Sequence, residues 1–168
     1  MLKNKLAIIG GSGLYNIEGL SNVESLKIKT PWGDPSDELT KASFKSNEVI
    51  FLPRHGRGHF ISPTKINFRA NIDALKQLGV TDIVSISAVG SLKEKLEPGM
   101  FVIVDQFIDR TFARNKTFFD EDIVAHVSMA KPTSEGLMNA CEESIKSENI
   151  QYKRGATYLV MEGPQFST

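Results

Sequence analysis

The stretch VIFLPRHGRGH, residues 49–59, decides the fold of this chain. Its first four residues are apolar and predict a buried strand, and the strand ends at a proline followed by arginines and histidines separated by glycines. Arg54 offers a planar fork of donors that matches two phosphate oxygens, and Gly56 and Gly58 let the backbone approach an anion closely. The pattern indicates an anion-binding loop; the alternative is a solvated basic turn.

Two further loops of small residues also follow strand-like runs. GGSGL, residues 10–14, follows the apolar run 6–9, and SAVGS, residues 87–91, follows the run 82–87. A parallel sheet would bring these two loops and the Arg54 loop to one edge, where Ser12 could donate to a phosphate oxygen. Taken alone, the glycines of 10–14 fit a tight turn equally well. Neither a dinucleotide fingerprint nor a Walker-type phosphate loop is present, so the sequence supports no NAD or ATP site.

Composition indicates one globular domain, and no linker or repeat divides residues 1–168. The chain is 40% hydrophobic and 24% charged, and its 20 basic and 20 acidic side chains balance. This balance argues against binding to nucleic acid or to an anionic membrane surface. No apolar stretch approaches the roughly 18 residues of a membrane span, so we expect a cytoplasmic protein. A single cysteine, Cys141, cannot form an internal disulfide.

Hydrophobic periodicity predicts alternating strands and helices. A helix is expected from Ser62-Pro63, as N-cap and first turn, to Gly79 as the residue after its end, and a second helix is expected after the capping cluster 132–134. Strands are expected at residues 6–9, 27–30, 44–52, 82–87, 101–104 and 156–161, and a long loop at 114–131. The order strand, helix, strand over 44–87 is a βαβ unit of a parallel sheet.

Two further features of the sequence each allow two interpretations. His55 and His59 have the spacing of a zinc pair, but the glycines between them argue against a helix and no third ligand lies nearby, so we expect no metal site. Trp32, in the turn 30–37, fits either a core position or a lid over a site.

Six motifs occur together in one order along the chain. They are GGSGL (10–14), PRHGR (53–57), NFRAN (67–71), AVGS (88–91), DQFIDRT (105–111) and EGPQFS (162–167). With these motifs the sequence closely resembles the S-methyl-5′-thioadenosine phosphorylases, within the trimeric purine nucleoside phosphorylase group. The resemblance runs from residue 5 to residue 168.

The resemblance implies a fold and a reaction. The expected fold is α/β, with a mixed, mostly parallel, twisted central sheet flanked by helices, in a homotrimer. The expected reaction is cleavage of the N-glycosidic bond of S-methyl-5′-thioadenosine by inorganic phosphate, which gives adenine and 5-methylthioribose 1-phosphate. Phosphate is then a co-substrate, and no cofactor is implied. The partners implied are small molecules, a purine nucleoside and phosphate.

The resemblance also assigns site residues. The phosphate ligands of the family fall on Ser12, Arg54, His55, Ser87 and Ala88. Residues that line the nucleoside pocket fall on Glu162, Phe166 and Ser167, with Phe166 against the base, and His126 matches a histidine that reaches a neighbouring subunit's pocket. The position of Ser167 helps to distinguish 6-amino from 6-oxo purines in this family.

The family pattern continues past the EGPQFS motif into segments that hold ribose and supply the acid that protonates the purine. From the sequence we therefore expect that residues 1–168 lack the C-terminal part of such a domain, and that the catalytic acid lies beyond Thr168. Two alternatives stay open at this point. One is a general or 6-oxopurine-preferring nucleoside phosphorylase, and the other is a non-catalytic remnant that serves as an oligomerisation module.

Overall fold

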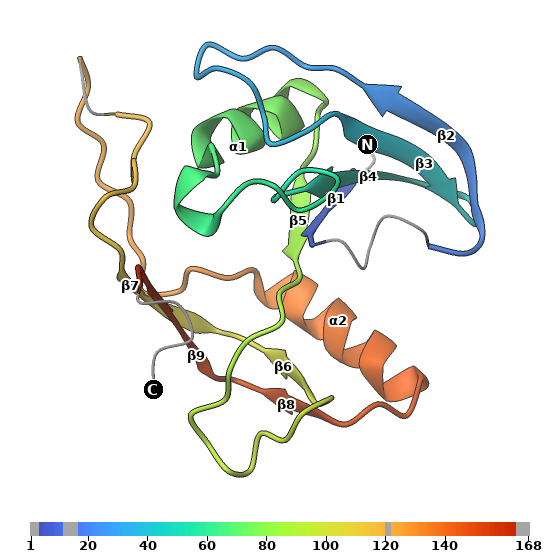
Figure 1. The fold of residues 1–168 in the computed structure, drawn as a ribbon. Coiled ribbons are helices and arrows are strands. Elements are labelled where there is room, and N and C mark those ends of the chain that lie inside the picture. Colours follow the sequence, from blue (N-terminus) through green and yellow to red (C-terminus); the bar gives the residue numbers. More distant parts are fainter. Residues whose placement is uncertain (1–3, 12–16, 120–121, 164–168) are drawn as a thin grey trace. The chain divides into compact units, whose positions relative to one another are not determined.

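The computed structural model describes residues 4–11, 17–119 and 122–163. These residues form two compact units (Figure 1). The first unit comprises residues 1–88 and 115–118, and the second comprises residues 89–114 and 119–168.

A five-stranded sheet forms the centre of the first unit. Its strands are β1 (Leu6–Gly10), β2 (Leu20–Leu26), β3 (Leu39–Phe44), β4 (Asn47–Pro53) and β5 (Asp82–Ser85), in the order β2-β3-β4-β1-β5. β1 pairs in parallel with β4 on one side and with β5 on the other, whereas β2, β3 and β4 are antiparallel neighbours. The carboxyl ends of β1, β4 and β5 therefore lie at one edge of the sheet.

Alternation along β4 divides the core between the two faces of this sheet. Ile50 and Leu52 join one apolar cluster, while Val49 and Phe51 join a second cluster with Ala42. Successive strand side chains point to opposite faces, so a run of four apolar residues places two on each face. This pattern identifies β4 as a strand buried on both sides.

Helix α1 (Phe68–Gln77) covers one of these faces (Figure 1). Its Ala74 and Leu75 are fully buried in the cluster that contains Ile50 and Leu52. The predicted helix started too early. Pro63–Lys65 forms a separate 3-10 helix, and α1 begins after Asn67, whose side chain accepts a hydrogen bond from the Ala70 amide at 3.2 Å.

Two parallel ribbons and one helix form the second unit. β6 (Phe101–Ile103) pairs with β8 (Tyr152–Arg154), and β7 (Gln106–Arg110) pairs with β9 (Thr157–Met161). The pairing keeps the same register in both, and backbone hydrogen bonds from Gly155 to Ile103 and from Asp105 to Ala156 bridge the gap between them. Helix α2 (Glu135–Ser147) starts at the predicted cap, where the Ser134 hydroxyl accepts from the Leu137 amide.

Two strand predictions were wrong in detail. Residues 27–30 are not a strand, because the strand of this region is β2, which ends at Leu26. Of the predicted strand 44–52, only the part from Asn47 belongs to β4, because Phe44 ends β3 and the turn between the two strands contains Lys45 at a φ of +55°. Short polar turns without glycine give a weak signal, so the predicted strand ran through this turn and β3 was missed.

The fold class is α/β, as predicted, and four of the six strand pairings are parallel. In the described residues, no helix has the length and apolar character needed to cross a membrane. The described parts of the predicted long loop, 114–119 and 122–131, contain neither helix nor strand.

Trp32 anchors part of this loop to the first unit. Its ring lies 4.5 Å from the Arg69 guanidinium and meets the Phe118 ring edge-on at 5.3 Å. Arg69 also donates to the Thr117 carbonyl at 3.4 Å. Cation–π and edge-to-face aromatic contacts of this kind favour one arrangement of the loop segment. Trp32 is half-buried and therefore packs against the loop instead of lying in the centre of the core.

In the second unit, Glu142 of α2 is held by three donors. They are Lys146 Nζ at 2.9 Å, Tyr152 Oη at 2.7 Å and Arg154 Nη1 at 2.5 Å. These bonds, with that from Lys146 the largest cause, lower the pKa of Glu142 to about 2. A lowered pKa means that folding favours the ionised carboxylate, so this contribution to stability is present at neutral pH.

The contribution of Glu142 should vary with pH in a definite direction. It is complete above the ordinary glutamate pKa of 4.5 and is lost as pH falls through about 2. Urea unfolding of the wild type and of Glu142→Gln should therefore differ most at about neutral pH and converge in acid. Glu143→Gln, an exposed neighbour on α2, should follow the wild type throughout. A difference that stays constant into strong acid would contradict a role for the charge.

Candidate functional site

The loops after β4 and β5 meet at the carboxyl edge of the five-stranded sheet, beside the end of β1. The Arg54 amide donates to the Gly10 carbonyl at 3.1 Å, which joins the start of the loop after β4 to the last residue of β1. The Arg54 guanidinium contacts the loop after β5: Nη1 donates to the Ile86 carbonyl at 2.6 Å and Nη2 to the Ser87 hydroxyl at 3.0 Å. The predicted proximity of the Arg54 loop and the Ser87 loop is thus present, because β1, β4 and β5 are adjacent and parallel. Residues 12–14 of the third predicted loop lie outside the described residues.

His55, which is buried in the first unit, accepts a hydrogen bond from the Arg54 side chain. Only 7% of its surface is exposed. Its Nε2 receives a hydrogen bond from Arg54 Nε at 3.1 Å, and its Nδ1 lies 2.8 Å from the Ile61 carbonyl oxygen. The His59 ring stacks on the His55 ring with 4.3 Å between centroids. Arg54 is thus fixed at all three of its nitrogens.

The turn that carries these residues requires glycine at position 56. Gly56 has a φ of +71°, and its amide donates to the Pro53 carbonyl at 3.0 Å. A Cβ there would lie 2.7 Å from the Phe60 ring, which is closer than any ordinary contact. The positive φ and the close ring explain why a glycine follows the Arg-His pair.

The structure places the predicted phosphate residues as follows. Arg54, His55 and Ser87 contact one another directly or through Arg54, and Ala88 follows Ser87 on the exposed loop after β5. The sequence did not indicate the Ile86 carbonyl, which is a backbone group and leaves no mark in residue type. Ser12 lies outside the described residues.

Glu162 lies in the second unit, directly after β9. Its side chain is only 6% exposed, and its Oε2 accepts from the amides of Phe112 and Ala113, both at 3.0 Å. The Arg114 guanidinium approaches Oε1 at 3.4 Å. β7 and β9 are parallel neighbours, so the carboxylate after β9 reaches the segment that follows β7. Sequence reasoning missed these partners because they lie some fifty positions away and two of them are backbone amides.

Of the other residues predicted to line the nucleoside pocket, the structure describes only His126. His126 is exposed, in the segment between β7 and α2. Phe166 and Ser167 lie outside the described residues. Within 4–11, 17–119 and 122–163, no cluster of three or more His, Cys, Asp or Glu side chains could hold a metal ion.

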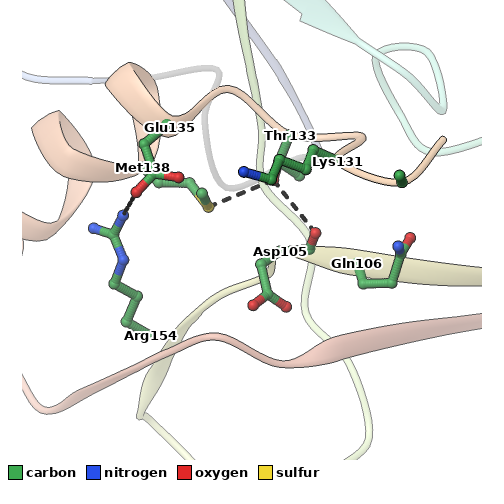
Figure 2. A pocket seen from close by; sticks show the side chains of 8 residues that line it. Asp105, Gln106, Lys131, Thr133, Glu135, Met138 and Arg154 are labelled. Carbon is green, nitrogen blue, oxygen red and sulfur yellow. Dashed lines mark hydrogen bonds and ion pairs between the residues drawn. The ribbon is translucent and has the colours of Figure 1, made fainter. Parts of the chain in front are cut away.

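A groove of about 710 Å³ opens in the second unit (Figure 2). Its lining residues come from the start of β7, the segment before α2, α2 itself and β8, and they are Asp105, Gln106, Ala130, Lys131, Thr133, Glu135, Met138 and Arg154. Arg154 Nη2 pairs with Glu135 at 3.0 Å and Nη1 with Glu142, so acidic neighbours offset its charge. None of the predicted site residues lines this groove, and we give it no part in the site.

Comparison with known proteins supports the same family as the motifs. A model of the Phosphorylase superfamily matches residues 5–168. S-methyl-5′-thioadenosine phosphorylase of Cereibacter sphaeroides is 56% identical over 167 residues, and the match covers 99% of this chain and 58% of the relative. The enzyme of the same name from Rhodospirillum rubrum is 56% identical over 163 residues, covering 97% of this chain and 55% of the relative.

Solved structures of methylthioadenosine phosphorylases have the same fold as this chain over the part that they share with it. A methylthioadenosine phosphorylase from an antarctic soil metagenomic library superposes with a TM-score of 0.94 at 49% identity, covering 98% of this chain and 58% of that one. Methylthioadenosine phosphorylase from Schistosoma mansoni in complex with adenine gives a TM-score of 0.91 at 34% identity, covering 99% of this chain and 65% of that one.

The chain spans a little more than half the length of these relatives. The family model covers nearly all of it, and the two loops that Arg54 joins, after β4 and after β5, carry two of the motifs. This chain belongs to the phosphorylase superfamily.

Proposed function

We propose that the protein catalyses phosphorolysis of S-methyl-5′-thioadenosine to adenine and 5-methylthioribose 1-phosphate. One observation carries the proposal: the Arg54 guanidinium is fixed at the carboxyl edge of the sheet, where it joins the loop after β4 to the loop after β5 beside the end of β1. Such an edge is where open α/β sheets bind anionic ligands, and a fixed guanidinium is suited to a phosphate. The names and high identities of the relatives favour this substrate.

The chemistry requires a phosphate oxygen to attack the anomeric carbon of the ribose. A carbon–oxygen bond to phosphate forms, the glycosidic carbon–nitrogen bond breaks, and its electron pair and a proton go to the purine. Like glycoside cleavage, this step passes through a cationic ribosyl centre, so an anion held in line lowers the barrier. We assign Arg54, His55, Ser87, Ala88 and Ser12 to the phosphate side.

On the nucleoside side we assign Glu162, His126, Phe166 and Ser167. Glu162 orders the segment after β7, and the resemblance puts Phe166 against the base. The protein is proposed to act as a cytoplasmic homotrimer of one domain per subunit. The exposed position of His126 is compatible with a role at a neighbouring subunit's pocket.

An assay of the purified protein tests the proposal. Adenine should be released from S-methyl-5′-thioadenosine only when inorganic phosphate is present, with methylthioribose 1-phosphate formed in equal amount. Adenosine and inosine serve as comparison substrates, and both should be cleaved less efficiently. Faster cleavage of inosine would point to a 6-oxopurine enzyme. No phosphate-dependent cleavage of any of the three would refute the proposal and favour a non-catalytic module.

A further inference from the structure

The hydrogen bonds of the buried His55 ring fix its protonated nitrogen and connect it to the proposed phosphate site through Arg54. Both of its ring nitrogens are engaged: Nε2 faces Arg54 Nε at 3.1 Å and Nδ1 faces the Ile61 carbonyl at 2.8 Å. A carbonyl oxygen only accepts and an arginine Nε–H only donates. Nδ1 must therefore carry the proton and Nε2 must offer its lone pair. This arrangement defines the neutral Nδ1–H tautomer of His55.

This tautomer has no N–H left for an anion. A phosphate dianion needs hydrogen-bond donors. The single N–H of the His55 ring donates to the Ile61 carbonyl, and its lone pair accepts from Arg54. The ring is also nearly buried, at 7% exposure. In this arrangement the imidazole acts on a bound phosphate through the arginine that it holds.

The bonds around Arg54 leave a defined set of donors. Its guanidinium has five N–H groups. One, on Nε, goes to His55, one on Nη1 goes to the Ile86 carbonyl, and one on Nη2 goes to the Ser87 hydroxyl. Among the described residues, these bonds leave one N–H on each of the two terminal nitrogens, and two such groups can donate to two phosphate oxygens. With Nε occupied, the contact must use the two terminal nitrogens.

We propose that His55 is a positioning residue whose Nε2 lone pair turns the Arg54 guanidinium so that its terminal nitrogens meet phosphate. The inference rests on the proposed phosphate site, and it replaces direct ligation by the His55 side chain with action through Arg54. It also explains why a histidine follows the arginine: its ring joins Arg54 to the end of the turn at Ile61.

Two conservative substitutions separate the two bonds of the ring. An asparagine amide can take the place of Nδ1 and keep the bond to Ile61, whereas a glutamine oxygen can take the place of Nε2 and keep the bond to Arg54. Binding of inorganic phosphate is measured by calorimetry, independently of turnover. His55→Asn should weaken it about tenfold, as expected for loss of a hydrogen bond to a charged group, and His55→Gln should stay within about threefold of the wild type.

A second readout distinguishes positioning from a general loss of structure. In the phosphorolysis assay, His55→Asn should raise the KM for phosphate while the KM for the nucleoside stays unchanged. In an Arg54→Ala background, His55→Asn should cause no further loss of phosphate binding, since its effect runs through the arginine. An equal loss in both backgrounds, or a larger loss for His55→Gln than for His55→Asn, would overturn the proposal.

The tautomer itself can be measured in the unaltered protein. Nitrogen-15 shifts of the His55 ring should show a protonated Nδ1 and an unprotonated Nε2 at neutral pH. A ring protonated at Nε2 would overturn the proposal even if both variants failed to fold. If phosphate binds and responds to His55→Asn while no nucleoside is cleaved, the positioning role stands and the proposed reaction falls.

Discussion

Replacing Arg54 with alanine is expected to weaken phosphate binding roughly 10- to 150-fold. The change removes a charge-assisted contact worth roughly 1.5 to 3 kcal/mol, and each 1.4 kcal/mol corresponds to about a factor of ten. It also removes the bonds from the guanidinium to Ile86 and Ser87, which join the loop after β4 to the loop after β5. The KM for phosphate should therefore rise at least as much as the dissociation constant.

Arg57→Ala provides the matched control. Arg57 belongs to the same turn, but its guanidinium donates to the Thr40 hydroxyl at 2.9 Å, toward β3. Its removal should leave phosphate binding within about twofold of the wild type, as is usual for a surface charge. Calorimetry on the two variants decides the matter. Equal losses for Arg54→Ala and Arg57→Ala would mean that the loop attracts phosphate by its overall charge and not through a fixed contact.

Replacing Glu162 with glutamine is expected to lower the free energy of unfolding by about 3 kcal/mol. The carboxylate is nearly buried and accepts from two backbone amides while facing the Arg114 guanidinium. Glutamine has the same shape but no charge, and one of its two terminal groups is a donor that cannot accept from an amide. The substitution removes the buried negative charge that the Arg114 guanidinium faces and that both amides donate to, which is why the expected cost is large.

Chemical denaturation and amide hydrogen exchange measure this effect. The amides of Phe112 and Ala113 should be protected in the wild type and should exchange faster in Glu162→Gln. Glu94→Gln, a change of the same kind at an exposed position of the second unit, should alter neither. Unprotected amides at 112 and 113 in the wild type would contradict the structural role of Glu162.

Glu162 has one role assigned by the resemblance and another shown by its contacts. The motif EGPQFS assigns it to the nucleoside pocket, and that assignment remains a proposal. The described contacts show a carboxylate that ties the end of β9 to the segment after β7. The most direct effect expected of its loss is therefore on the order of residues 112–114.

The sequence alone determined the class of the fold and the edge of the sheet at which we propose the anion site. The apolar runs 6–9 and 49–52 and the strand-like run 82–87, each followed by a loop that contains glycine, predict parallel strands whose loops share one edge. Burial of a strand on both faces leaves a strong mark in composition, as β4 shows. The start of α2 was predicted correctly because a cap is a local interaction within a few residues.

Only the tertiary structure decided what those residues do. The sequence placed Arg54 and His55 side by side, but it could not show that one ring nitrogen holds the arginine while the other holds the turn at Ile61. It could not show the Ile86 carbonyl or the amides of Phe112 and Ala113 as partners, because backbone groups are the same in every residue. Periodicity and caps record local geometry, whereas these bonds join segments that the fold alone brings within 3 Å or so of one another.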